Sequence, residues 1–322
     1  RADARPARPQ THSIILAENT PGGVAAPAAT GGQRPPPGCR GARRAGRRAT
    51  PRALDRDAAR RIFPGMRRQA ASLLCTLLLA APAPALELHL RDSFHFPRVA
   101  SLEWDPRLCA LWVAIEGPQL FLLTPGGREI RRIEPGLPSI RALTVEADGL
   151  LVADGWGGFQ RITRTGDPRG GRFELAPHLR DVEGLQREPS GTFLVVEDDP
   201  ARLLRLGPDG STLMERAGAA FSPRLEEMQG VARDPLTGNI LVVDDNEGLN
   251  ALVEMTPDGE LISVTPLSEW GYDAEAVAVH AQTGTLFVGF DSGQRIAVFD
   301  YLPTRPATGF VSFDQGPDCP VS

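Results

Sequence analysis

The stretch DVEGLQREPSGTFLVVEDD (residues 181–199) opens with two acids and a glycine, passes through a turn and ends in an apolar run followed by two acids. The same pattern returns as EMQGVARDPLTGNILVVDD (residues 227–245) and as DAEAVAVHAQTGTLFVGFD (residues 273–291), 46 residues apart each time. Short β-branched runs bounded by Gly, Pro and Asp are typical of strands joined by tight turns. The repeat therefore predicts a fold built from copies of one small β unit.

Five copies of this unit are recognisable in the chain. Aligning the apolar residue after each opening pair gives spacings of 41 to 46 residues, at Leu102, Leu143, Leu185, Val231 and Val277. A period of this length with four strands per unit is typical of a β-propeller. We therefore expect an all-β fold with four-stranded antiparallel blades, five of them visible and a sixth possible. The segment LELHLRDSFHF (residues 86–96) is expected to add an outer strand to the last blade and so close the ring.

The chain divides into three parts by composition. Residues 1–65 are rich in Arg, Pro and Gly, and we expect them to be disordered or a misannotated upstream segment. Residues 66–85 combine Met, two Arg, an apolar stretch and an Ala-Pro-Ala end, which predicts a signal peptide. Residues 86–322 form the expected propeller domain. The protein is accordingly expected to be periplasmic or secreted, without a membrane span after signal cleavage.

The charge is distributed unevenly along the chain. All 35 basic residues are Arg; residues 1–65 carry a net charge of +9 and residues 86–322 a net charge of −16. A nucleic-acid partner requires a basic face, so the acidic propeller domain argues against one. Cation binding is compatible with this charge.

Acidic and amide residues open three of the five units. In a propeller the first strand of each blade lines the central tunnel, so these residues are expected at one mouth. The predicted metal ligands are Asp181, Glu183, Gln229, Asp273 and Glu275. Crowded carboxylates repel one another unless neutralised, and an all-oxygen set favours a divalent cation such as Ca²⁺. A solvated tunnel rim is the alternative.

The strands that follow each turn return to the same mouth and bring further acids. They include Asp245 together with Asp198, Asp244 and Asp291, and we expect most of the last three to cap turns. Arg141 opens the second unit and is predicted to bind an anionic substrate or to pair with an acid. The aromatic residues Trp156, Trp270 and Tyr272 are expected to flank the mouth. We expect them either to stack on a ligand or to pack over blade edges.

Two cysteines lie in the expected mature chain, Cys109 near its start and Cys319 near its end. Closure of the ring would bring the two ends of the chain together, and an oxidising compartment permits a disulfide bond. Two buried free thiols are the alternative.

Several stretches resemble a known family. ASLEWDPRLCALWVAIEGPQLFLLTPGGREIRRIE, DVEGLQREPSGTFLVVEDDPARLLRL, MQGVARDPLTGNILVVDDNEGLNALVEMTPDGELIS and AEAVAVHAQTGTLFVGFD are similar to the SdiA-regulated family of exported propellers, over most of residues 99–300. NHL-repeat, SMP-30/gluconolactonase-like and esterase-like phytase propellers look similar. In the metal-dependent relatives, acids or amides that open the inner strands hold a divalent cation, which implies that role for Glu183, Gln229 and Glu275. Ala100 and Arg141 depart from that pattern, and the SdiA-regulated family implies no settled activity.

Two functions fit these observations. One is a metal-dependent hydrolase of a small ester, lactone or phosphoester, with Glu183 or Glu275 as the base. The other is a non-catalytic propeller that binds a small molecule or a protein at the same mouth. A monomer is expected in either case, and the sequence leaves open whether the protein is an enzyme.

Overall fold

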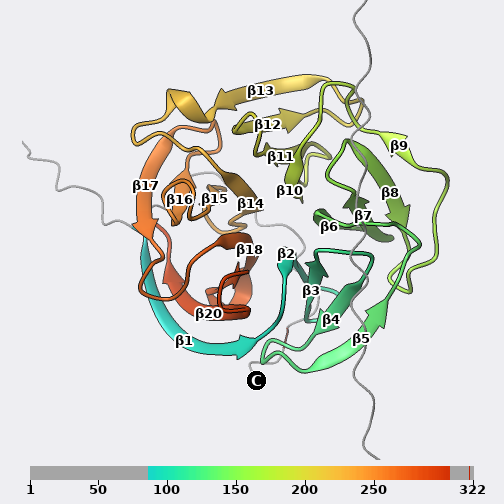
Figure 1. The fold of residues 1–322 in the computed structure, drawn as a ribbon, viewed down its shortest axis with the longest axis horizontal. Helices are drawn as coiled ribbons and strands as arrows, with labels where there is room; N and C mark the ends of the chain where they lie inside the picture. Colours follow the sequence, from blue (N-terminus) through green and yellow to red (C-terminus); the bar gives the residue numbers. More distant parts are fainter. Residues whose placement is uncertain (1–85, 305–318, 320–322) are drawn as a thin grey trace, which may run out of the picture. The chain divides into compact units, whose positions relative to one another are not determined.

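The computed structural model describes residues 86–304 and residue 319. Twenty strands form five four-stranded antiparallel sheets, which stand as blades around one axis (Figure 1). The prediction of an all-β propeller with four-stranded blades is confirmed. The described residues form five blades, and none of them forms a sixth.

Blades 1 to 4 each take four consecutive strands, counted from the axis outwards. Blade 1 contains β2 (Val99–Asp105), β3 (Ala110–Ile115), β4 (Leu120–Leu123) and β5 (Glu129–Ile133). Blade 2 contains β6 (Ala142–Glu146), β7 (Gly149–Ala153), β8 (Gly158–Ile162) and β9 (Phe173–Glu174). Blade 3 contains β10 (Val182–Arg187), β11 (Phe193–Glu197), β12 (Arg202–Leu206) and β13 (Thr212–Ala217). Blade 4 contains β14 (Met228–Arg233), β15 (Ile240–Asp244), β16 (Ala251–Met255) and β17 (Leu261–Pro266).

Blade 5 combines both ends of the described chain. It contains β18 (Ala274–His280), β19 (Thr285–Phe290) and β20 (Arg295–Leu302), and its outer strand is β1 (Glu87–His95). β1 pairs antiparallel with β20 from Glu87 opposite Leu302 to His95 opposite Arg295. Two short 3₁₀ helices, Gly218–Ala220 and Ala281–Thr283, complete the elements. The expected closing strand is therefore present.

A disulfide bond joins blade 1 to the other end of the chain. Cys109 and Cys319 are bonded to each other, with their Cα atoms 5.2 Å apart. The backbone N–H of Cys319 also donates to the Gln282 side chain, 3.2 Å away, beside the hairpin between β18 and β19. Of the two alternatives left open by the sequence, the structure contains the bonded one.

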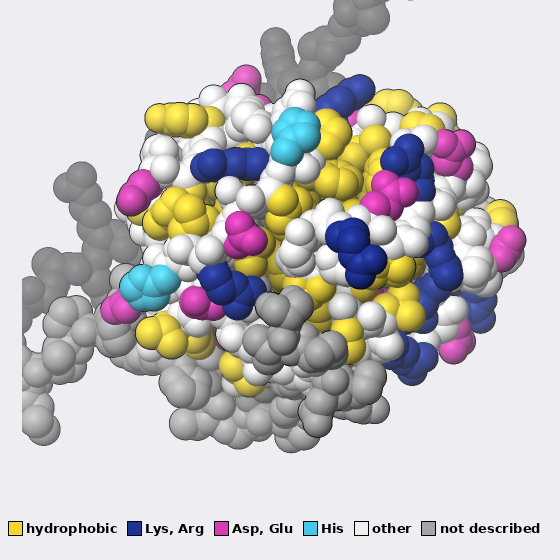
Figure 2. Space-filling view, turned by 90° about the horizontal axis from the view of Figure 1, so that it is seen from below, with side chains coloured by type: hydrophobic (Ala, Val, Ile, Leu, Met, Phe, Trp, Pro, Cys, Tyr) yellow, Lys and Arg dark blue, Asp and Glu magenta, His cyan; other side chains and the backbone are white. Residues whose placement is uncertain are grey.

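The core lies between the blades. The middle strands of each sheet are buried on both faces, and their apolar side chains form clusters shared by neighbouring blades, such as the one that joins Trp112 of blade 1 to Leu143 of blade 2. Each sheet alone would leave both faces in water, so radial stacking is what stabilises it. On the face seen in Figure 2, acidic and Arg side chains are interspersed with apolar ones, so neither sign of charge dominates that face. None of the helices in the described part of the chain has the length and apolarity to cross a bilayer.

Candidate functional site: the acidic mouth of the tunnel

The inner strands β2, β6, β10, β14 and β18 run side by side around the axis (Figure 1). All of them start at one mouth of the tunnel, because each blade is traversed in the same direction. The strands β3, β7, β11, β15 and β19 run antiparallel to them and end at this mouth. The residues that open each repeat and those that close its second strand therefore meet there, as the sequence predicted for a propeller.

A β-bulge marks the start of several inner strands. In β10 the register passes from Val182 to Gly184, and in β18 it passes from Ala274 to Ala276. The extra residue left between the paired positions is Glu183 in one strand and Glu275 in the other. A bulge bends the strand and re-aims the bulged side chain, so both carboxyl groups occupy the position that ordinary strand alternation would not give them.

Glycines allow the inner strands to approach closely beside these bulges. A Cβ atom at Gly184 would lie 2.5 Å from the carbonyl oxygen of Gln229, and one at Gly230 would lie 2.7 Å from the Cα of Ala276. In the opening Glu-Gly and Gln-Gly pairs of the repeat, the glycine therefore permits close packing of the inner strands, and the Glu or Gln supplies the polar group.

Three carboxylates from blades 4 and 5 gather at the mouth. Carboxylate oxygen atoms of Asp245, Asp273 and Glu275 lie within 4.8 Å of one another. Asp273 has a left-handed backbone, with φ of 66°, a conformation that Asp tolerates better than most residues. Its carboxylate accepts a hydrogen bond from the Asn246 side chain at 2.8 Å. The geometry thus fixes Asp273 between the loop after β15 and the start of β18.

A second group at the mouth combines an arginine with two acids. The Arg141 guanidinium lies 3.7 Å from the Glu183 carboxylate and 3.3 Å from that of Glu116. Glu116 also accepts from Arg98 at 2.8 Å. Of the two roles expected for Arg141, pairing with an acid is present in the structure. Neighbouring residues cover more than half of the surface of its side chain.

Burial and mutual repulsion raise the pKa of the acids at this mouth. Desolvation, followed by the charges of Asp273 and Asp245, raises the pKa of Glu275 to about 9. Desolvation raises the pKa of Glu183 to about 7, although the Arg141 charge acts in the opposite direction. The pKa of Asp245 is raised to about 6, again mainly by desolvation. Such a concentration of perturbed carboxyl groups is characteristic of a functional site.

Other acids of the second strands divide into two kinds. Asp244 caps a turn, because its carboxylate accepts from the backbone N–H groups of Glu226, Glu227 and Leu249. Asp198 belongs to the mouth instead: desolvation and its contact with Glu227 raise its pKa to about 8. Asp245, which follows the capping residue Asp244, belongs to the three-acid group. The sequence placed it at the mouth but not among the metal ligands, because two adjacent acids cannot be told apart from the sequence.

The remaining predicted residues have distinct surroundings. Gln229 is buried at the start of β14. Asp181 contacts Glu183, and its carboxylate accepts from the backbone of Asp199. Trp270 packs edge-on against Phe299, with ring centroids 5.1 Å apart, in the manner of a core residue. Trp156 and Tyr272 are 73% and 57% exposed, so their rings are free to contact a ligand.

Comparison with known proteins supports the fold through one solved structure. No protein-family model matches the chain, and no curated protein matches its sequence. Among solved structures, glutaminyl cyclase of Myxococcus xanthus superposes with a TM-score of 0.52 at 12% identity, over 67% of this chain and 97% of that one. The WD40 propeller domain of Doa1 gives a TM-score of 0.43 at 15% identity, over 62% of this chain and 63% of that one. A protein of unknown function from Bacteroides caccae gives 0.37 at 17% identity, over 56% and 65%. The likeness to the Myxococcus protein, together with the five sheets in a ring, identifies the fold as a β-propeller.

Proposed function

We propose that this chain is an exported β-propeller that binds Ca²⁺ at its acidic tunnel mouth and hydrolyses a small ester, lactone or phosphoester there. One observation carries the proposal. Blades 4 and 5 bring Asp245, Asp273 and Glu275 together, and blades 2 and 3 bring Arg141 and Glu183 to the same mouth.

The three-acid group fits a hard divalent cation. Ca²⁺ lies about 2.3–2.6 Å from its oxygen ligands, so oxygens within 4.8 Å of one another can share one ion. No His or Cys is among the three residues, which disfavours zinc. A cation would also offset the repulsion from Asp273 and Asp245 that, after desolvation, raises the pKa of Glu275.

The second group supplies the residues for hydrolysis. Glu183 is the proposed general base, held beside Arg141 in a mostly buried position from which its carboxylate can accept a proton from water. Arg141 is the proposed contact for negative charge on the substrate. A bound cation would polarise the scissile carbonyl or phosphoryl group.

The test is an esterase, lactonase and phosphatase screen of the full chain with and without Ca²⁺. We expect turnover that a chelator abolishes and that Glu183→Gln lowers by about 100-fold or more, the usual contribution of a general base. Glu129→Gln, the same change on the exposed outer strand of blade 1, is the matched control and is expected to leave turnover unchanged. Unchanged turnover in Glu183→Gln contradicts the assigned role.

Cation binding is tested separately by thermal unfolding. Saturating Ca²⁺ is expected to stabilise the protein, by about 2.7 kcal/mol at 100 times the Kd, and Glu275→Gln is expected to remove most of this gain. A melting temperature that does not change when Ca²⁺ is added would rule out cation binding and, with it, the metal-dependent reaction.

The second candidate is a non-catalytic propeller that binds a ligand or protein at the same mouth. The exposed Trp156 and Tyr272 favour it, because aromatic side chains with one free face are enriched at binding surfaces. Stabilisation by Ca²⁺ without turnover of any substrate class would select this function.

The wider assignment rests on the sequence. The resemblance to the SdiA-regulated propellers, the signal-like residues 66–85 and the Cys109–Cys319 bond all support a location in the periplasm or outside the cell. Cell fractionation of a tagged chain tests this location, and a cytoplasmic product would contradict it.

A further inference from the structure

A cavity lies at the opposite end of the tunnel from the acidic mouth. Its volume is about 380 Å³, within the range of small-molecule sites. All five blades contribute to its lining, each through the last residues of its inner strand or the turn that follows. The cavity is thus formed by the ends of the strands whose beginnings carry the acids.

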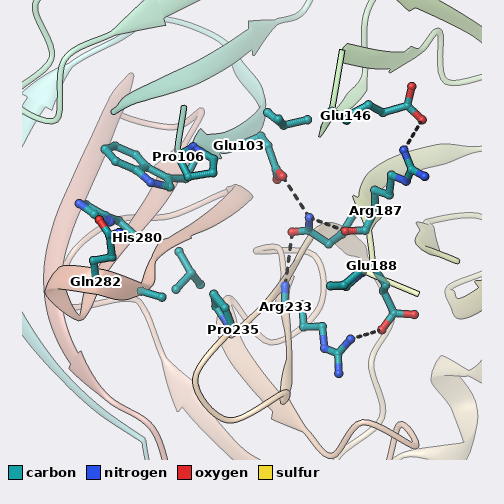
Figure 3. Close-up of a pocket in the computed structure, with 16 residues that line it drawn as sticks. Glu103, Pro106, Glu146, Arg187, Glu188, Arg233, Pro235, His280 and Gln282 are labelled. Atoms are coloured by element: carbon teal, nitrogen blue, oxygen red, sulfur yellow. Dashed lines mark hydrogen bonds and ion pairs between the residues drawn. The ribbon is translucent and has the colours of Figure 1, made fainter. Parts of the chain in front are cut away.

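Blades 1 and 5, which are neighbours in the ring, supply an apolar part of the lining. Trp104 and Pro106 come from blade 1 and Val279 from blade 5. The Trp104 indole is held in place by the His280 imidazole, which stacks on it with ring centroids 3.9 Å apart. In Figure 3, Pro106 and His280 lie on one side of the cavity and Arg187 lies on the other. The apolar body of a ligand has a matching surface on the first side.

Blades 2 and 3 carry two buried carboxylates, each of which is already bound by an arginine of the third strand. The Arg161 guanidinium donates to both carboxylate oxygen atoms of Glu146, at 2.9 and 3.4 Å. The Arg205 guanidinium donates to both carboxylate oxygen atoms of Glu188, at 2.6 and 3.1 Å. Two-point pairs of this kind are among the strong ion pairs of proteins, and each balances the charge of its carboxylate.

The inner strands bring a second arginine to each of these carboxylates. The Arg187 guanidinium lies 3.2 Å from Glu146, and the Arg233 guanidinium lies 3.0 Å from Glu188 (Figure 3). Both of these arginines line the cavity. Among the six groups, four arginines therefore stand against two carboxylates. This excess of positive charge attracts an anion to the cavity.

Arg187 is the arginine that a ligand can reach. Its side chain is 36% exposed, and its Nη1 atom donates to Glu146. In the part of the chain that the structure describes, its Nε and Nη2 atoms donate no hydrogen bond. A guanidinium presents its N–H groups in a planar fork that matches the two oxygen atoms of a carboxylate. Arg187 can therefore pair with a ligand carboxylate while it keeps its contact with Glu146.

The other acids near the cavity do not oppose an anion of low charge. Glu103 points into the middle of the cavity, where it accepts from the Gln186 amide at 3.0 Å (Figure 3). Burial raises the pKa of Glu103 to about 8, so its carboxyl group is mostly protonated at pH 7. Asp105 is paired with Arg164 at 2.6 Å. Because the excess of positive charge is small, a carboxylate with one charge fits it better than a phosphate ester with nearly two.

We propose that this cavity is a second ligand site, specific for a small carboxylate with an apolar body. The carboxylate pairs with the Arg187 guanidinium, and the apolar body lies against the side formed by Trp104 and Pro106. The proposal does not rest on the hydrolytic function assigned to the acidic mouth, and the site requires no cation.

The test is calorimetric titration of the full chain with 2-naphthoate. Its uncharged amide, 2-naphthamide, has the same rings without the charge, and acetate has the charge without the rings. We expect 2-naphthoate to bind with a Kd below about 1 mM and the other two to bind at least about tenfold more weakly. Equal binding of either matched compound, or no binding of 2-naphthoate up to about 1 mM, would overturn the proposal.

A phosphate ester of the same ring system tests the expected charge of the ligand. We expect 2-naphthyl phosphate to bind more weakly than 2-naphthoate, because it brings more negative charge next to two buried carboxylates. Tighter binding of the phosphate would assign the cavity to phosphate esters and would overturn the specificity for a carboxylate.

Arg187→Gln tests the contact with the ligand carboxylate. Loss of a charged hydrogen bond is expected to weaken 2-naphthoate by about tenfold or more. Glu146 keeps its two-point pair with Arg161 in this variant, so the fold is expected to persist. Arg132→Gln, the same change in an exposed ion pair on the outer strand of blade 1, is the matched control and is expected to bind like the wild type. Unaltered binding in Arg187→Gln would contradict the assigned contact.

Two further variants locate the apolar body. Ala147→Trp fills the cavity from its exposed rim and is expected to abolish binding of 2-naphthoate. Ala219→Trp, the same change at an exposed position outside the lining, is expected to bind like the wild type. Unaltered binding in Ala147→Trp would place the ligand elsewhere and refute the proposal.

Failure of this proposal is distinguishable from failure of the proposed function. The titrations are made with a chelator present and repeated with Ca²⁺ in excess. Binding of 2-naphthoate is expected to be the same in both cases, whatever the outcome of the Ca²⁺ experiments on the acidic mouth. A requirement for Ca²⁺ would show that the carboxylate binds to a cation at the acidic mouth, and would overturn the second site.

Discussion

Replacing Glu103 by Gln is expected to change how the stability of the propeller depends on pH. Glu103 is 7% exposed inside the tunnel, and its pKa is raised from 4.5 to about 8, chiefly by desolvation. Hydrogen bonds from Gln186, the Val145 backbone and Thr144 lower it, and the nearby Asp105 charge raises it. The folded protein therefore holds a proton that the unfolded chain has released over most of the range from pH 4.5 to about 8.

The sign follows from this proton difference. Where the folded state binds more protons, stability decreases as the pH rises, by about 1.4 kcal/mol per pH unit for one proton. Glu103 alone should therefore lower the free energy of unfolding by about 2–3 kcal/mol between about pH 5.5 and about pH 7.5. The stabilising contribution is complete below the unfolded pKa and is lost as the pH approaches the folded one.

Urea unfolding of the wild type and Glu103→Gln across this pH range measures the effect. The other raised acids contribute equally to both proteins, so the difference between the two pH profiles isolates residue 103. The variant can be more or less stable than the wild type at any one pH, because the amide changes the hydrogen bonds with Val145 and Thr144. Parallel profiles would show that Glu103 is ionised in the folded protein and would refute the reasoning.

Three further changes are expected to destabilise the fold. Gly184→Ala should cost about 1–3 kcal/mol in urea unfolding, because its Cβ would meet a backbone carbonyl of the next inner strand, while Gly126→Ala, with nothing within 4 Å, should cost little. Equal effects of the two changes would contradict this packing. Cys319→Ser opens a disulfide spanning 210 residues, so the free energy of unfolding should fall by about 5 kcal/mol and become insensitive to reductant. Glu188→Gln removes a buried carboxylate from two arginines and should lower the melting temperature through a loss of about 3 kcal/mol; an unchanged melting temperature would show that the pairs contribute nothing.

The fold could be predicted because its signal is repeated. Each blade presents the same order of short strand, turn and β-branched run, so an error in one unit is corrected by the other four. The closing strand could be predicted for a related reason: the inner three strands of blade 5 are present in the repeat, while the fourth is missing from its C-terminal side. The segment before Val99 has the alternating pattern of a strand and could supply it, and in the structure it does.

The candidate site could be predicted only in outline. The repeat places acids at the openings of three inner strands, and that was enough to bring Glu183 and Glu275 to one mouth. It does not reveal the bulges that leave these two residues between paired positions, since a bulge depends on how two strands are matched. Nor does it separate Asp244, which caps a turn, from Asp245, which joins the three-acid group.

A cavity of about 380 Å³ at the far end of the tunnel (Figure 3) had no recognisable signal in the sequence. Glu103, Gln186 and His280 lie near the ends of inner strands, where they look like ordinary polar residues at turns. Their contacts connect three different blades, and Glu103 and Gln186 are 83 positions apart. No local pattern can show that two such residues share one cavity, so the structure was needed to find it.

The two ends of the tunnel differ because the same strands meet different neighbours there. At their starts, the inner strands meet the acidic ends of the second strands, where Arg98 and Arg141 contact Glu116 and Arg141 also contacts Glu183. At their far ends, Arg161 and Arg205 from the third strands contact two buried carboxylates that Arg187 and Arg233 of the inner strands also contact. The first end therefore concentrates carboxylates that repel one another, whereas at the second end two arginines hold each of the two carboxylates.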